Sequence, residues 1–258
     1  DSHVFFLFVR IRVSPDLYLE SMRRFSLIVI CFLLGTSLFS QQYNKYSSSY
    51  NFKKAMEFLE NEDSESALGA FKDEVKEHKD NGYAYLFIAS IQQNNENFGE
   101  ALSAIEYAIK YIPKKDKEYK SLSLYKRAGI YVALNESDKA LKDFTSAIAL
   151  CPDEDYYAER AQIYYELEQY DLADSDYRMM LSLDAHNAMA YMGLGRNHIA
   201  KGEYQSATER FDYVISLYPE YSSGYSFRAE ARMMLKDYSG ASSDVAKALS
   251  IDGDNKAF

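Results

Sequence analysis

Residues 188–221 read AMAYMGLGRNHIAKGEYQSATERFDYVISLYPEY, and the pattern of this stretch recurs along the chain. In its second half, Ala207 and Phe211 are four residues apart, which places them on one face of a helix. Alanines stand at the equivalent places 34 residues before and after, at Ala173 and Ala241. Self-similarity at a fixed period of this length predicts an array of small stacked units rather than a single core.

The first half of each unit has its own mark, a large residue followed four positions later by a small one. The small residue lets two helices approach closely, and the large residue fills a wider gap. These pairs are Tyr85 and Ala89, Leu124 and Ala128, Tyr157 and Ala161, Tyr191 and Gly195, and Tyr225 and Ala229. Prolines at 113, 152 and 219 end second helices, because proline lacks the N–H that would continue the helix.

This spacing of large, small and proline positions resembles the tetratricopeptide repeat (TPR), whose unit is a helix–turn–helix. The resemblance implies an all-α fold, a right-handed α-solenoid of about six antiparallel helix pairs. The step from Ala101 to Ala140 is 39 residues, so about five residues are inserted near 115–120. The array is expected over 51–258, with repeats at about 48–81 (degenerate), 82–115, 121–153, 154–187, 188–221 and 222–255.

The N-terminal residues are predicted to carry an export signal. Met22 is followed by two arginines, by an apolar run over 25–39, and by the small residue Ser40, where polarity begins. This order predicts a secretory signal peptide over 22–40, with cleavage after Ser40. Upstream of it, residues 1–21 are interpreted as spurious sequence.

The residues in and around this signal indicate whether the protein is exported or stays anchored in the membrane. The apolar run is shorter than the ~20 residues that cross a bilayer as a helix, so an uncleaved anchor is the weaker alternative. Cys31 is not expected to carry a lipid, because the bulky Ile30 precedes it. Residues 41–50 are polar and serine-rich, which predicts a flexible linker. We expect an exported protein, in the periplasm or cell envelope of a bacterium or secreted, with no stable transmembrane span after signal cleavage.

Three repeats share a charged pair at the same spacing. Each carries an arginine in its first helix and an aspartate sixteen residues later in its second. A charge on a packed helix face is costly unless it is paired, so we predict a structural ion pair inside each repeat. The alternative is shared ancestry of the three copies without contact. The pairs are Arg127 and Asp143, Arg160 and Asp176, and Arg228 and Asp244.

Composition and reactive residues argue against catalysis. The chain is 47% hydrophobic and has a net charge of −10, which disfavours a nucleic-acid partner. Cys151 has no histidine placed to activate it, and no histidine pair has metal-ligand spacing. The acidic stretches 153–155 and 252–255 are interpreted as helix starts or solvated loops rather than calcium sites. We therefore predict no catalytic residues, no metal, no cofactor and no enzyme.

The resemblance implies a concave groove, lined by the first helices, for a protein or peptide partner. Transferred by repeat register, the groove residues are Tyr83, Leu86, Gln93, Tyr125, Gln162, Tyr165, Met189, Met192, Arg196 and Glu230. Chaperone-binding members of the family clamp a C-terminal carboxylate with lysine and asparagine at places that here hold Tyr125, Ala158, Met192 and Gly129, Gln162, Arg196. That clamp is absent, so binding of chaperone tails is not expected.

Three functions remain open from the sequence. The first is an exported, non-catalytic scaffold that binds other proteins through its groove. The second is a cell-wall or carbohydrate-binding envelope protein that uses exposed tyrosines as stacking platforms. The third is the N-terminal recognition region of a longer enzyme or sensor.

Overall fold

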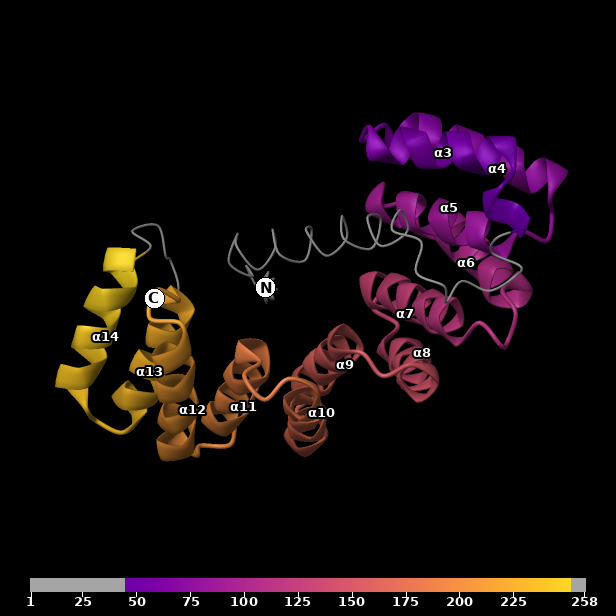
Figure 1. The fold of residues 1–258 in the computed structure, drawn as a ribbon. Helices are drawn as coiled ribbons and strands as arrows, with labels where there is room; N and C mark the ends of the chain where they lie inside the picture. Colours follow the sequence, from indigo (N-terminus) through magenta and orange to yellow (C-terminus); the bar gives the residue numbers. More distant parts are fainter. Residues whose placement is uncertain (1–44, 252–258) are drawn as a thin grey trace, which may run out of the picture. The chain divides into compact units, whose positions relative to one another are not determined.

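The structure, a computed structural model, describes residues 45–251 (Figure 1). The predicted signal peptide and the sequence upstream of it lie outside these residues. Every regular element within 45–251 is an α-helix, so the all-α prediction is confirmed. The chain divides into two compact units, one ending at Glu77 and one beginning at His78, and each is described by itself.

The first unit holds one helix pair, α3 (Tyr50–Glu60) and α4 (Ser64–Glu77). The side chain of Ser49 accepts a hydrogen bond from the Phe52 N–H at the start of α3 and donates one to Glu74 of α4. Phe52 also meets Phe71 edge to face, with ring centroids 5.4 Å apart. Tyr46 is buried at 2% exposure. The expected linker therefore does not extend as far as residue 50, because its last residues already belong to this unit.

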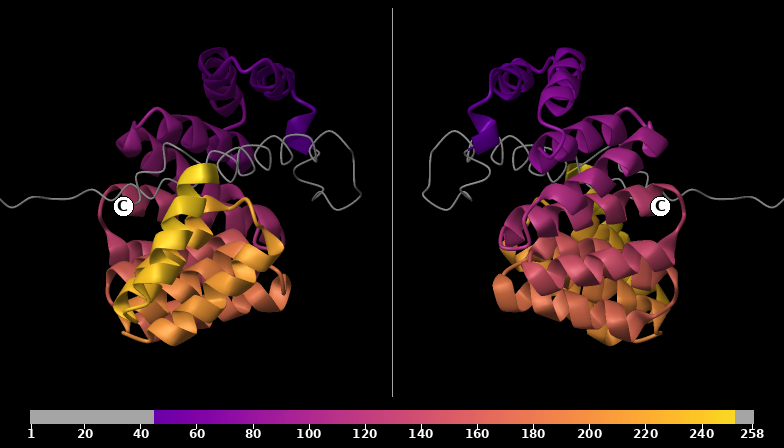
Figure 2. Two further views of the ribbon diagram at one scale, coloured as in Figure 1. Left: turned by 90° about the vertical axis from the view of Figure 1, so that its left-hand side faces the viewer. Right: turned by 90° about the vertical axis from the view of Figure 1, so that its right-hand side faces the viewer.

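The second unit holds five successive helix pairs. They are α5 (Gly82–Asn94) with α6 (Phe98–Tyr111), α7 (Lys117–Ala133) with α8 (Ser137–Leu150), α9 (Glu154–Glu166) with α10 (Tyr170–Leu183), α11 (Ala188–Ala200) with α12 (Tyr204–Leu217), and α13 (Ser222–Met234) with α14 (Tyr238–Ile251). Each pair packs on the next, and the turned views show the same stacking (Figure 2). This arrangement is an α-solenoid.

The insertion near 115–120 lengthens a first helix. α7 has 17 residues, whereas α9 has 13. Its additional first turn carries Tyr119, whose ring meets the ring of Tyr83 edge to face at 5.0 Å. The Tyr83 hydroxyl donates to Asp116, the residue before α7, over 2.6 Å. The insertion is thus absorbed as helix and covers the neighbouring first helix.

The turn inside each pair contains one residue with a left-handed backbone, about two residues after the first helix ends. This conformation reverses the chain without a long loop. Glycine and asparagine adopt it readily, whereas other residues do so at a cost. The residues are Glu62, Glu96, Asn135, Glu168, Gly202 and Lys236, with φ between 58° and 76°.

Candidate binding surface

The three predicted arginine–aspartate pairs are present as bidentate ion pairs. In each, arginine Nε and Nη2 donate to the two oxygens of one carboxylate, which is buried. The distances are 2.6 and 2.8 Å for Arg127 and Asp143, 2.8 and 2.6 Å for Arg160 and Asp176, and 2.9 and 2.6 Å for Arg228 and Asp244. This geometry holds the first helix of a repeat at one place on its second helix.

Two of these arginines also donate hydrogen bonds to the preceding repeat, a contact that the sequence analysis does not predict. Arg160 Nη1 donates to Thr145 Oγ1 over 2.9 Å, and Arg228 Nη1 donates to Asp212 Oδ1 over 2.6 Å. Both acceptors occupy equivalent positions in their repeats: each lies in the second helix, two residues after the position that holds the paired aspartate in three of the repeats. A polar residue at this position is the feature of the sequence that could have indicated the contact. The arginines therefore join repeats as well as the helices within a repeat.

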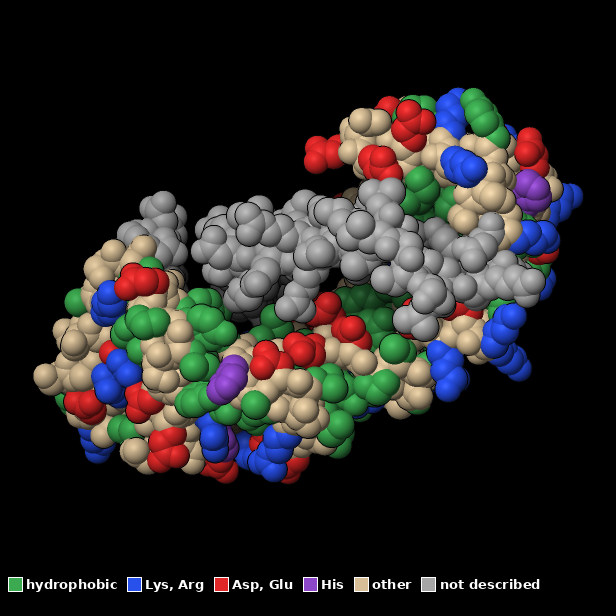
Figure 3. All heavy atoms as spheres, in the orientation of Figure 1, with side chains coloured by type: hydrophobic (Ala, Val, Ile, Leu, Met, Phe, Trp, Pro, Cys, Tyr) green, Lys and Arg blue, Asp and Glu red, His purple; other side chains and the backbone are tan. Residues whose placement is uncertain are grey.

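We define the first-helix face as the surface of α5, α7, α9, α11 and α13 in the second unit. Helices α7, α9 and α11 lie on the inner side of the curve that this unit follows, and α8, α10 and α12 lie outside them (Figure 1). Figure 3 shows acidic and hydrophobic side chains next to one another over α9 and α11. All ten groove residues predicted from the register belong to helices of this face.

Three of those ten residues are packing residues. Tyr83, Leu86 and Met192 are exposed by only 1%, 4% and 7%. Met192 belongs to the core cluster that contains Phe211 and Val214 of α12. The prediction that these three side chains line an open groove is therefore wrong, because neighbouring helices cover them.

The other seven predicted residues keep some exposed surface, and several of them contact neighbours on the same face. They are Gln93, Tyr125, Gln162, Tyr165, Met189, Arg196 and Glu230. The Tyr125 ring stacks on Tyr156 with centroids 4.6 Å apart. Gln162 Nε2 donates to Glu166 over 2.8 Å along α9. Contacts of this kind limit the conformations of the surface side chains before any partner arrives.

The electrostatics around Tyr125 are acidic. Burial raises the pKa of its hydroxyl, and the carboxylates of Glu159 and Asp155 on α9 raise it further. The hydroxyl is therefore a neutral donor at physiological pH. This end of the first-helix face offers aromatic surface beside negative charge.

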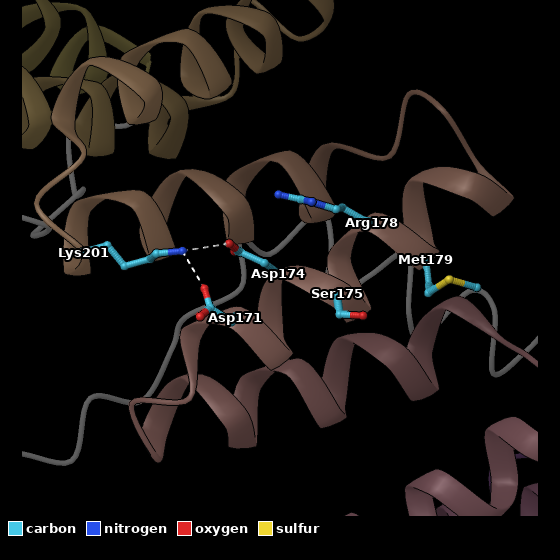
Figure 4. A pocket seen from close by; sticks show the side chains of 6 residues that line it. All are labelled: Asp171, Asp174, Ser175, Arg178, Met179 and Lys201. Atoms are coloured by element: carbon cyan, nitrogen blue, oxygen red, sulfur yellow. Dashed lines mark hydrogen bonds and ion pairs between the residues drawn. The ribbon is translucent and has the colours of Figure 1, made fainter.

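A second concavity lies away from this face, over α10 and the end of α11 (Figure 4). Its volume is about 360 Å³. Lys201 Nζ lies 2.8 Å from Asp171 and 3.3 Å from Asp174, and Asn197 donates to Asp174 over 2.7 Å. The hydrogen bond from Lys201 lowers the pKa of Asp171. The charges of Lys201, Asp171 and Asp174 therefore satisfy one another. It is lined by Asp171, Asp174, Ser175, Arg178, Met179 and Lys201.

Reactive groups are few in the part of the chain that the structure describes. Burial raises the pKa of the Cys151 thiol, and Glu118 and Asp153 raise it further, which disfavours the nucleophilic thiolate. Within residues 45–251, no three His, Cys, Asp or Glu side chains are grouped so that they would hold a metal ion. No helix in the same range has the length and apolar character needed to cross a membrane.

The helix pairs and their period form an α-solenoid of the kind that tetratricopeptide repeat proteins share. Residues 52–117 and 122–154 each match a family model described as tetratricopeptide repeat, so this chain contains such repeats. A mitochondrial import receptor subunit from Rattus norvegicus is 34% identical over 106 residues, which are 40% of this chain and 34% of that protein. The chain therefore spans about a third of the length of this curated relative.

Solved structures show the same fold. A tetratricopeptide repeat protein from Parabacteroides merdae superposes with a TM-score of 0.66 at 24% identity, over 82% of this chain and 80% of that one. A second structure, YrrB, is described as a TPR protein with an unusual peptide-binding site. It superposes with a TM-score of 0.59 at 18% identity, over 73% of this chain and 95% of that one. Tetratricopeptide repeat proteins generally mediate protein–protein interaction.

Proposed function

We propose that this protein is a non-catalytic scaffold that binds a protein or peptide partner through the exposed side chains of α9, α11 and α13. The observation that carries the proposal is a preformed surface. Aromatic, methionine and arginine side chains stay partly exposed on these helices, and buried ion pairs hold α9 and α13 in place. A surface that is already ordered loses little conformational entropy on binding. Methionine adapts to varied partners because it is flexible and polarizable.

Met189 provides a test with a matched control. It is 42% exposed on α11, on the first-helix face, whereas Met179 is 43% exposed on the second helix α10. Displayed random peptides are selected on the full chain, and their dissociation constants are measured by calorimetry. We expect Met189→Ala to weaken the selected peptides about fivefold through lost apolar contact. Met179→Ala is expected to leave them unchanged. Equal effects of the two substitutions, or no selectable peptide, would contradict the proposal.

We further propose that the protein is exported. Support comes from the order of Met22, two arginines, an apolar run and Ser40, which lies outside the described residues. Expression in a bacterium from Met22, followed by fractionation, is expected to yield a chain that begins at Gln41 in the envelope or medium. The N-terminus is read by mass spectrometry. A chain that keeps residues 22–40 and stays in the cytoplasmic fraction would refute export without affecting the binding proposal.

A further inference from the structure

The second helix α10 carries a stripe of exposed apolar side chains. Leu172, Met179 and Leu183 are 48%, 43% and 50% exposed. Their spacings of seven and four residues place them along one side of the helix. Among the described residues, neither α8 nor α12, the second helices of the repeats before and after, has a large hydrophobic side chain that is exposed. Apolar side chains that gather on an exposed surface indicate an interaction site.

A line of opposite charges runs along α10 beside this stripe. Asp171 and Arg178 are also seven residues apart, and both line the hollow that Ser175 and Met179 border (Figure 4). The side chain of Asp171 is 92% exposed although it contacts Lys201, so its carboxylate has room for a second donor. Arg178 is exposed and has no ion-pair or hydrogen-bond partner in the part of the chain that the structure describes.

This surface is complementary to a second copy of itself. We consider two α10 helices that lie antiparallel, with a two-fold axis between their Ser175 residues. Leu172 is three residues before Ser175 and Met179 is four after it, so each leucine lies opposite a methionine of the other copy. Asp171 is four residues before and Arg178 three after, so each carboxylate lies opposite a guanidinium. The small serine at the centre lets the helices approach closely.

The neighbouring second helices lack this combination. Polar or charged side chains stand in place of both the first leucine and the central serine of α10. They are Lys139 and Lys142 in α8, and Ser206 and Glu209 in α12. A pairing shifted by one repeat would put these side chains against the apolar stripe, which favours the contact of α10 with α10.

We propose that a second copy of this chain docks antiparallel on α10 and forms a symmetric homodimer. The apolar side chains supply the attraction, and the two exposed ion pairs fix the orientation. One helix from each copy makes a small contact, so the dimer is weak, with a dissociation constant on the order of 10 µM. Helix α10 lies on the outer side of the curve that the second unit follows (Figure 1), so dimerisation leaves the first-helix face free. The inference is therefore independent of the proposed function.

The apolar contact is tested by sedimentation velocity of the full 258-residue chain over a range of concentrations. We expect a reversible equilibrium between monomer and dimer. Met179→Lys should weaken dimerisation about tenfold or more, because it places a charge in the apolar contact. Met234→Lys, at a methionine that is 54% exposed on α13, is the matched control and should change nothing. A wild-type chain that stays monomeric, or equal effects of the two substitutions, overturns the inference.

Reversal of single charges tests the orientation. Asp171→Arg sets two arginines opposite each other at both ends of the contact, and Arg178→Asp sets two aspartates there. Each variant alone should therefore be monomeric at concentrations at which the wild type is dimeric. An equimolar mixture of the two variants should dimerise again, because every arginine then faces an aspartate. The variant that carries both reversals in one chain should dimerise by itself.

The outcomes separate the antiparallel contact from other contacts. A dimer that neither reversal weakens uses another surface and overturns the inference. A mixture that stays monomeric, while circular dichroism shows the helices of both variants intact, overturns the antiparallel pairing. Recovery in the mixture and in the double variant supports it, because only charges that meet across the contact compensate each other.

Discussion

Replacing Asp176 by alanine is expected to lower the free energy of unfolding by about 3 kcal/mol, because it leaves the charge of Arg160 partly buried without its partner. Asp176 is 2% exposed, and its carboxylate accepts hydrogen bonds from Nε and Nη2 of Arg160, at 2.8 and 2.6 Å. The same arginine also donates to Thr145 of the preceding repeat. Loss of the pair should therefore weaken both the repeat and its junction. Chemical denaturation followed by circular dichroism measures the shift in midpoint.

A second aspartate of the same helix is the control. Asp171 also forms an ion pair, with Lys201 at 2.8 Å, but its side chain is 92% exposed. Asp171→Ala is expected to change stability by less than ~1 kcal/mol, since solvent screens an exposed pair. The double variant Arg160→Met with Asp176→Leu should recover most of the loss, because an apolar pair needs no desolvated charge. A midpoint for Asp176→Ala equal to that of Asp171→Ala would show that the buried pair contributes nothing.

Gly193→Ala is expected to destabilise the fold by about 1–3 kcal/mol through overpacking. A Cβ at this position would lie 2.2 Å from the ring of Tyr177 on α10. That ring is 5% exposed and packs in a core cluster with Tyr157 and Leu194, so it has little room to move. First helices elsewhere carry long side chains at this place in register, such as Lys126 and Glu159. The glycine thus belongs to this one junction and not to the repeat pattern.

The same substitution at Gly99 is the control, and there we do not expect destabilisation. Apart from its chain neighbours and the adjacent backbone of α6, no atom lies within 4 Å of a Cβ built at Gly99. The change should be neutral or stabilise the helix by up to ~1 kcal/mol, because alanine has the higher helix propensity. Thermal midpoints of the two variants measure both effects. Combining Gly193→Ala with Tyr177→Leu should recover stability, and a merely additive loss would refute the steric explanation.

Much of the fold follows from local signals in the chain. The spacing of alanines and the positions of the prolines indicate where helices pair, because a repeat contacts only itself and its neighbours. For the same reason, the partners Arg127 and Asp143 were identifiable sixteen residues apart. The second acceptor of Arg160, Thr145, belongs to the preceding repeat, so the pattern within one repeat does not indicate it.

The binding surface depended more on packing between repeats. The position of a residue within the repeat correctly assigns it to a first helix. It does not indicate how much of the side chain a neighbouring helix covers. Tyr83 is buried because the inserted turn of α7 brings Asp116 and Tyr119 onto it. Met192 is buried because α12 and α13 close over it. Each of these burials depends on the packing at one particular junction between repeats. The repeat pattern describes what all repeats share, so it does not indicate them.

The period, the helix pairs and the three buried ion pairs could thus be predicted from the sequence, because each depends on residues within one repeat. Which side chains of the first-helix face remain exposed depends instead on how the repeats pack against one another. Arg196 is the clearest case, because its two aromatic neighbours come from the repeats before and after its own. The distance between Tyr165 and Phe227 depends on how successive repeats stack, and no single 34-residue unit contains that information.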